Sequence, residues 1–154
     1  MFVAGWLACS SPPPSAPPPP PKVHMRLRYD SANAAKDAMI AGDDLAARTA
    51  LRTLAGLGAT EGLPSELAPR AADLAAAATT AEHANDRMAL ARSVGAVGVA
   101  CGGCHHQAGA GPTFSGEPLP AGDDTKALMQ RHRWAVDRMW EALLTEDTHR
   151  WQSG

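Results

Sequence analysis

From Val23 onward, apolar residues recur at steps of three or four along the chain. This spacing places them on one face of an α-helix, and the pattern predicts helices over about 23–41, 44–55, 65–78, 79–107 and 123–144. Runs of β-branched residues that alternate with polar ones, as in half-buried strands, are missing. The pattern therefore predicts an all-α protein.

The same register predicts which side chains face inward. The first helix would bury Met25, Tyr29, Ala32, Ala35 and Met39, the second Ala47, Leu51 and Leu54, the third Leu67, Ala71, Leu74 and Ala78, the fourth Met88, Ala91, Val94 and Cys101, and the fifth Met129, His132, Val136, Trp140 and Leu143. Gly42 ends the first helix, and the capping-box sequence from Thr79 to Glu82 is expected to begin the fourth.

The amino-acid composition limits the size of the domain, the kind of core and the class of partner. The chain has 154 residues, 45% of them hydrophobic but only 5% aromatic, so alanine makes up much of the apolar share. This length fits one domain with appendages, and alanine lets helices pack closely while burying little area per residue. A formal net charge of −2 without a basic block argues against a nucleic-acid partner.

The fourth expected helix ends in Cys101-Gly102-Gly103-Cys104-His105, a C-x-x-C-H sequence. This sequence is typical of covalent haem c attachment, in which the two thiols bind the haem vinyl groups and the histidine ligates the iron. On a helix, Cys104 and His105 follow Cys101 by three and four residues, so all three side chains lie on one side. A bound haem would also supply apolar core that the alanines lack, so we expect the haem-free chain to fold weakly.

Two other interpretations of the motif are weaker. A zinc site through Cys101, Cys104 and His105 or His106 would normally draw a second ligand pair from elsewhere, and the only other cysteine is Cys9. A thioredoxin-type redox pair belongs after a strand at a helix N-terminus, whereas this pair ends a helical stretch. Nucleophile–base pairs, phosphate loops and carboxylate dyads are also missing from the pattern, so we expect no enzyme.

The N-terminal 22 residues differ from the rest. Residues 1–9 are apolar and end in Cys9, which resembles the end of a bacterial lipoprotein signal with a lipidated cysteine. The alternative is an incidental cysteine in a disordered segment. Residues 10–22 are rich in proline and predict an extended linker. Together these features indicate a periplasmic or cell-envelope protein, anchored through lipid at Cys9 and not by a membrane-spanning helix.

Four helices followed by C-x-x-C-H resemble the cytochrome c′ and cytochrome c556 class over residues 23–107. The resemblance implies an antiparallel four-helix bundle with haem c between the helices, thioether bonds at Cys101 and Cys104, and His105 as the proximal ligand. It also implies a homodimer. The chain departs from the class in its tail, where a glycine- and proline-rich loop at 108–122 leads into a C-terminal helical segment at 123–154.

In the resembling class, the first helix supplies the residue over the other face of the iron. Met25 is our first candidate for this sixth ligand, His132 of the fifth helix is the alternative, and His24 follows. A thioether ligand suits electron transfer. The leading hypothesis is a monohaem c-type cytochrome that exchanges single electrons with a redox partner protein. The alternatives are a five-coordinate haem protein that binds nitric oxide or carbon monoxide, and a non-haem helical metal or redox module.

Overall fold

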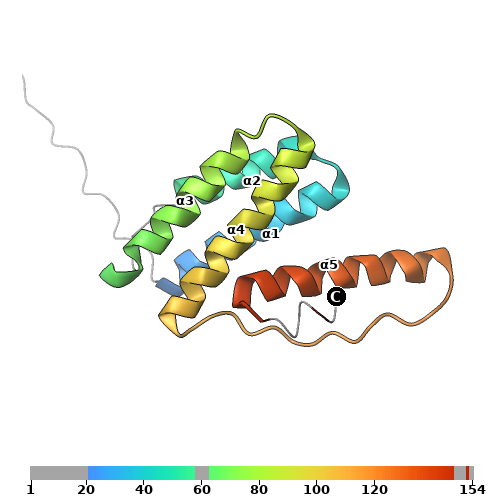
Figure 1. Ribbon diagram of the computed structural model, residues 1–154. Helices are drawn as coiled ribbons and strands as arrows, with labels where there is room; N and C mark the ends of the chain where they lie inside the picture. The colour runs from blue at the N-terminus through green and yellow to red at the C-terminus, as the bar shows by residue number, and fades with distance from the viewer. Residues whose placement is uncertain (1–20, 58–62, 148–151, 153–154) are drawn as a thin grey trace, which may run out of the picture.

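The computed structural model describes residues 21–57, 63–147 and 152, and these residues form helices and loops without a strand (Figure 1). The helices are α1 (Pro21–Ala41), α2 (Asp44–Gly56), a short 3-10 helix η1 (Ser65–Leu67), α3 (Ala68–Glu82), α4 (Arg87–Ala108) and α5 (Thr125–Thr145). The expected all-α class is thus confirmed. Among the described helices, none is both long enough and apolar enough to cross a membrane.

The turn between α1 and α2 forms where the sequence predicted it. Gly42 adopts φ +83°, a left-handed conformation that glycine reaches without steric cost. The carboxylate of Asp43 then accepts a hydrogen bond from the Ala46 amide at 2.9 Å, which caps α2. The expected linker at 10–22 overlaps α1, because that helix already begins at Pro21. The predicted signal at residues 1–9 and the predicted linker at residues 10–20 lie outside the described residues.

The start of the fourth helix was predicted wrongly. Residues 79–82 continue α3, and the Thr79 hydroxyl donates to the Ala75 carbonyl at 2.9 Å, as an interior helix residue can. The cap of α4 is Asp86 instead, whose carboxylate accepts from the Ala89 amide at 2.7 Å. The alanines before Thr79 are strong helix formers, and they carry α3 past the apparent capping box.

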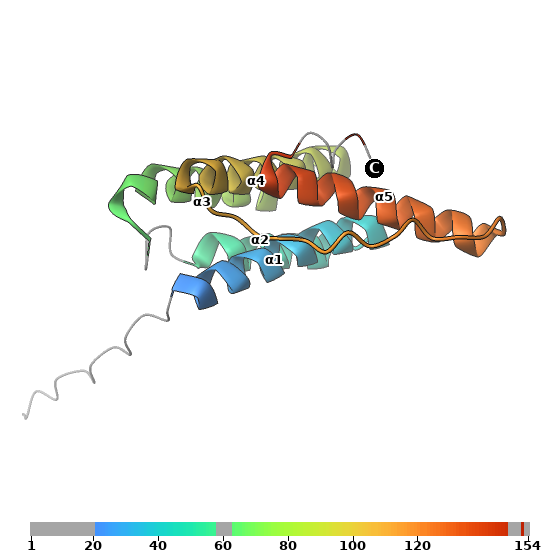
Figure 2. The same ribbon diagram turned by 90° about the horizontal axis from the view of Figure 1, so that it is seen from below.

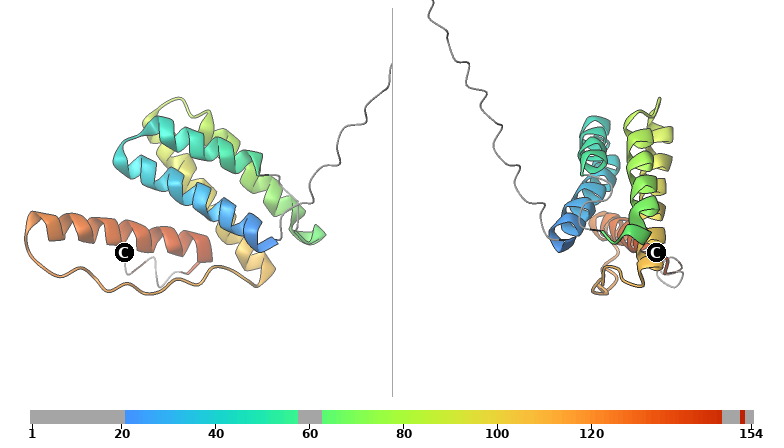
Figure 3. Two further views of the ribbon diagram at one scale, coloured as in Figure 1. Left: turned by 180° about the vertical axis from the view of Figure 1, so that it is seen from behind. Right: turned by 90° about the vertical axis from the view of Figure 1, so that its left-hand side faces the viewer.

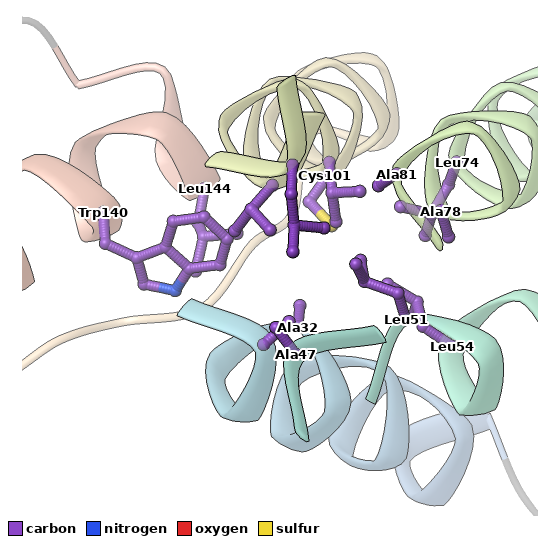
Figure 4. Close-up of a cluster of buried hydrophobic side chains, with 14 residues drawn as sticks. Ala32, Ala47, Leu51, Leu54, Leu74, Ala78, Ala81, Cys101, Trp140 and Leu144 are labelled. Atoms are coloured by element: carbon purple, nitrogen blue, oxygen red, sulfur yellow. The ribbon is translucent and has the colours of Figure 1, made fainter. Parts of the chain in front are cut away.

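Consecutive helices pack side by side, and α1 also contacts α4 (Figure 2). The core between them is built largely from small residues with a few leucines, and it includes Cys101 and the indole of Trp140 (Figure 4). The inward positions predicted for α2 and α3 are all buried: Ala47, Leu51, Leu54, Leu67, Ala71, Leu74 and Ala78. In α1, Ala32 and Ala35 are buried and the other three predicted residues are half-buried.

The loop at 109–124 runs back along the molecule, and α5 then packs on α4 in the same general direction, with its first half extending past the other helices (Figures 1 and 3). The second half of α5 therefore supplies the core residues Trp140 and Leu144, whereas the first half contacts mainly the loop before it. The predicted inward face is wrong over the first half, where Met129 is 61% exposed and His132 is also exposed. Met88 and Ala91 in the first turns of α4 were likewise predicted to be buried, but Met88 is 62% exposed and Ala91 is also exposed.

Candidate functional site

One pocket lies between α1, α3, α4 and the end of α5. Its walls are formed by Met25, Arg28, Tyr29 and Ala32 from α1, Leu63 before η1, Arg70, Ala71 and Leu74 from α3, Cys101, Cys104 and His105 from α4, and Leu144 from α5. Four site residues predicted from the sequence therefore meet in one place, namely Met25, Cys101, Cys104 and His105. Tyr29, Ala32, Ala71 and Leu74 had been predicted only as core.

The helix α4 holds the two cysteines and the histidine on the pocket side. Cys101 and Cys104 are buried, at 9% and 8% exposure, and His105 is half-buried one residue further on. The intervening Gly102 is buried against α5, since a Cβ built there would lie 2.1 Å from the Leu143 carbonyl oxygen. The backbone of the motif is thus packed on one side and presents its two thiols on the other.

The ring of His105 is oriented by a contact with α5. Its Nδ1 lies 2.8 Å from the Leu144 carbonyl oxygen. A carbonyl oxygen can only accept a hydrogen bond, so Nδ1 carries the proton and Nε2 keeps its lone pair in the neutral ring. This is the arrangement in which an imidazole can bind a metal through Nε2.

Burial keeps both thiols protonated. Burial, with a smaller contribution from the neighbouring Cys104, raises the pKa of Cys101 to about 12 against the opposing charge of Arg28. Burial also raises the pKa of Cys104, against the opposing charges of Arg28 and Arg70. A thioredoxin-type pair has the opposite requirement, a lowered thiol pKa. The redox-pair interpretation of the motif therefore has no electrostatic support in this environment.

Two arginines belong to the pocket that the sequence analysis did not select. Arg28 is buried on α1, and the Arg70 guanidinium on α3 donates from Nε to the Gln107 side-chain oxygen at 3.0 Å. They add positive charge to walls that are otherwise mainly apolar. Arg28 could have been found, because it lies three residues after Met25 and four before Ala32 on the same helix face. Nothing in the sequence around Arg70 indicates that its side chain lies in the pocket.

The other histidines lie elsewhere. His132 is exposed on α5 and is not among the pocket residues, so the structure does not bring this alternative ligand to the site. His24 is 5% exposed, does not line the pocket, and finds no hydrogen-bond partner for either ring nitrogen among the described residues. His106 is exposed and lies 3.5 Å from the Glu146 carboxylate. Cys9 lies outside the described residues.

Within residues 21–57, 63–147 and 152, no three histidine, cysteine, aspartate or glutamate side chains converge so that they could hold a metal ion directly. The zinc interpretation of the motif thus has no geometric support there. Comparison with protein families, curated proteins and solved structures gives no match. The chemistry of the pocket is therefore the basis for assigning a function.

Proposed function

We propose that the protein is a monohaem c-type cytochrome of the cell envelope that transfers single electrons. The observation that carries the proposal is the meeting of Met25, Cys101, Cys104 and His105 in one pocket between the helices. Met25 is 76 residues before Cys101 in the sequence, so the C-x-x-C-H motif alone does not account for its presence there. A flat, apolar, iron-containing group is the ligand that needs these four side chains together.

The residues fit haem c. Cys101 and Cys104 would bind it through thioether bonds, Nε2 of His105 would ligate one face of the iron, and the Met25 sulfur would ligate the other. When bound, the haem supplies an iron centre that gains and loses one electron, at a potential set by its ligands and surroundings. The apolar walls formed by Ala32, Ala71, Leu74 and Leu144 would exclude water from the macrocycle.

The two arginines suit the polar edge of the same group. Haem carries carboxylates on one edge, and guanidinium groups pair well with carboxylates. Arg28 and Arg70 would therefore hold that edge. The three arginines of α5 do not line the pocket and pair elsewhere: Arg131 contacts Asp123, Arg133 contacts Asp37 and Asp137, and Arg138 is buried against Glu141.

We also propose that α1–α4 form an antiparallel four-helix bundle like that of the cytochrome c′ and c556 class. The packing of α1 on α2, α2 on α3, α3 on α4 and α1 on α4 supports it. The redox partner protein, a homodimer and a lipid anchor at Cys9 belong to the same proposal. The fifth helix remains the feature in which the chain departs from that class.

The second candidate is a gas-binding haem protein with an open iron face. It is favoured if Met25 stays an ordinary core residue, because the iron would then have no protein ligand on one face and could bind a small gas molecule there. The Met25 thioether therefore separates the two candidates.

The test uses full-length protein matured with haem in a bacterial periplasm, together with Met25→Ala and the control Met39→Ala. Met39 is half-buried in the same helix but does not line the pocket. We expect a c-type pyridine haemochrome, and a ferrous low-spin spectrum that carbon monoxide changes in Met25→Ala but not in wild type or Met39→Ala. An immediate shift of the wild-type spectrum would favour the gas-binding protein, and absence of the haemochrome would overturn both candidates.

A further inference from the structure

We propose that α5 is a positioning element for the proximal histidine, acting through the main-chain carbonyl of Leu144. This inference rests on the proposed function, because it concerns the histidine assigned to the iron. It goes beyond that function by giving the fifth helix a role in setting the electron affinity of the site.

The hydrogen bond itself fixes the ring. With the His105 Nδ1 proton donated to the Leu144 oxygen at 2.8 Å, rotation of the imidazole would break the bond. Both partners are shielded, since Leu144 is 2% exposed and His105 is half-buried. Water therefore competes poorly for this proton. The tautomer and the ring plane are both set by the same contact.

The acceptor also has suitable electrostatics. Leu144 lies in the last turn of α5, which ends at Thr145. Carbonyl groups in a last helical turn lack the usual amide donors and carry the negative end of the helix dipole. The Glu146 and Asp147 amides both turn back to the Ala142 carbonyl. The helix end thus directs partial negative charge to the imidazole N–H.

The helix α5 can reach His105 because α4 has glycines where the two helices meet. A Cβ at Gly98 would lie 2.9 Å from the Trp140 ring, and one at Gly102 would lie 2.1 Å from the Leu143 carbonyl oxygen. The second distance is shorter than real Cβ contacts allow, so any side chain at Gly102 must displace the α5 backbone. Leu143 adjoins Leu144, so the displacement moves the acceptor of the His105 hydrogen bond.

The expected effect has a definite sign. A carbonyl that accepts the Nδ1 proton makes the imidazole a stronger electron donor to iron, which favours the ferric state and lowers the reduction potential. Losing the acceptor should therefore raise the potential. If α5 served only to cover the pocket, its displacement would admit water, stabilise the more highly charged ferric state and lower the potential.

The experiment compares Gly102→Ala with Gly103→Ala in full-length, haem-loaded protein. Gly103 lies in the same motif, but a Cβ there would meet only ordinary contacts, the nearest being the Glu146 carboxylate at 3.7 Å. A c-type haemochrome in both variants first establishes that the haem is attached. We then expect the potential of Gly102→Ala to exceed those of wild type and Gly103→Ala. An unchanged or lower potential in Gly102→Ala would overturn the inference while leaving the proposed function intact.

A second measurement needs no variant and covers the case in which Gly102→Ala fails to fold. In wild-type haem-loaded protein, the Nδ1 proton of the iron-bound imidazole should be visible by NMR and exchange with solvent more slowly than an exposed ring proton. Its exchange at the rate of an exposed imidazole would contradict the bond to Leu144. A protein without attached haem would instead contradict the proposed function.

Discussion

Replacing Asp137 by asparagine should loosen the attachment of α5 to α1. Lys36 and Asp37 on α1 meet Arg133 and Asp137 on α5 in one network of alternating charges. Lys36 ion-pairs with both aspartates, and its side chain is only 8% exposed. The Asp137→Asn substitution preserves the shape of the side chain and removes one negative charge. It leaves two cations facing a single carboxylate.

The burial of the network sets the magnitude. Removing one partner of a fully buried ion pair costs about 3–5 kcal/mol, whereas an exposed pair contributes only about 0.2–1 kcal/mol. Asp137 is one-third exposed and Lys36 keeps Asp37 at 3.0 Å, so the cost lies between these limits. We expect a loss of about 1.5–2.5 kcal/mol in the free energy of unfolding. This corresponds to a fall in Tm of roughly 3–10 °C for a chain of this size.

The assay is urea unfolding of haem-loaded wild type, Asp137→Asn, Lys36→Met and the double variant. Because the two residues contact one another, the double variant should lose less than the sum of the single losses, with a coupling of about 1 kcal/mol or more. Asp30→Asn is the control, since its pair with Arg26 is exposed and should contribute less than about 0.5 kcal/mol. Equal losses for Asp137→Asn and Asp30→Asn, or strict additivity in the cycle, would refute this reasoning.

Further outcomes follow from single sites. Burial would raise the pKa of Asp137, but hydrogen bonds and charge from Lys36 and Arg133 outweigh it and lower that pKa. The wild-type advantage over Asp137→Asn should therefore be full above about pH 4, the unfolded aspartate value, and vanish as acid titrates the folded carboxylate; a gap that widens in acid would contradict this. Leu90→Ala should lower the free energy of unfolding in urea by about 2.7–5 kcal/mol, because Leu90 is fully buried and its truncation leaves a cavity. A loss below about 1 kcal/mol would contradict a rigid core, since it would require neighbouring side chains to fill that cavity. Gly95→Ala should instead raise the free energy of unfolding by about 0.5–1 kcal/mol, since nothing lies within 4 Å of a Cβ there and alanine favours the helix. A lower stability of this variant would contradict the presence of free space beside Gly95.

The sequence predicted the helices best where packing is uniform along their length. In α2 and α3 one face is buried from end to end, so a period of three to four residues identified every buried position that was named. The same rule was wrong for α5, because half of that helix extends beyond its neighbours. The helical period does not report where a neighbouring helix ends. The false start at Thr79 has a local cause, since alanine propensity outweighed the capping pattern.

In the candidate site, the sequence predicted the residues that share a face of one helix better than those that reach the pocket through tertiary packing. Cys101, Cys104 and His105 share a helix face through their spacing alone, and Met25 followed from the first helix face together with the family resemblance. Arg70 and Leu144 reach the pocket through tertiary packing, which leaves no pattern in the neighbouring residues. The close approach of α5 to Gly98, where a Cβ would meet Trp140 and Leu143, likewise depends on tertiary packing.

The most direct test of the central claim is the intact mass of full-length protein matured in the periplasm, before and after acid–acetone extraction. The account predicts that wild type carries the mass of one haem that extraction does not remove, and that Cys101→Ser/Cys104→Ser carries none. A wild-type mass equal to that of the bare polypeptide would contradict covalent attachment and the function proposed from it.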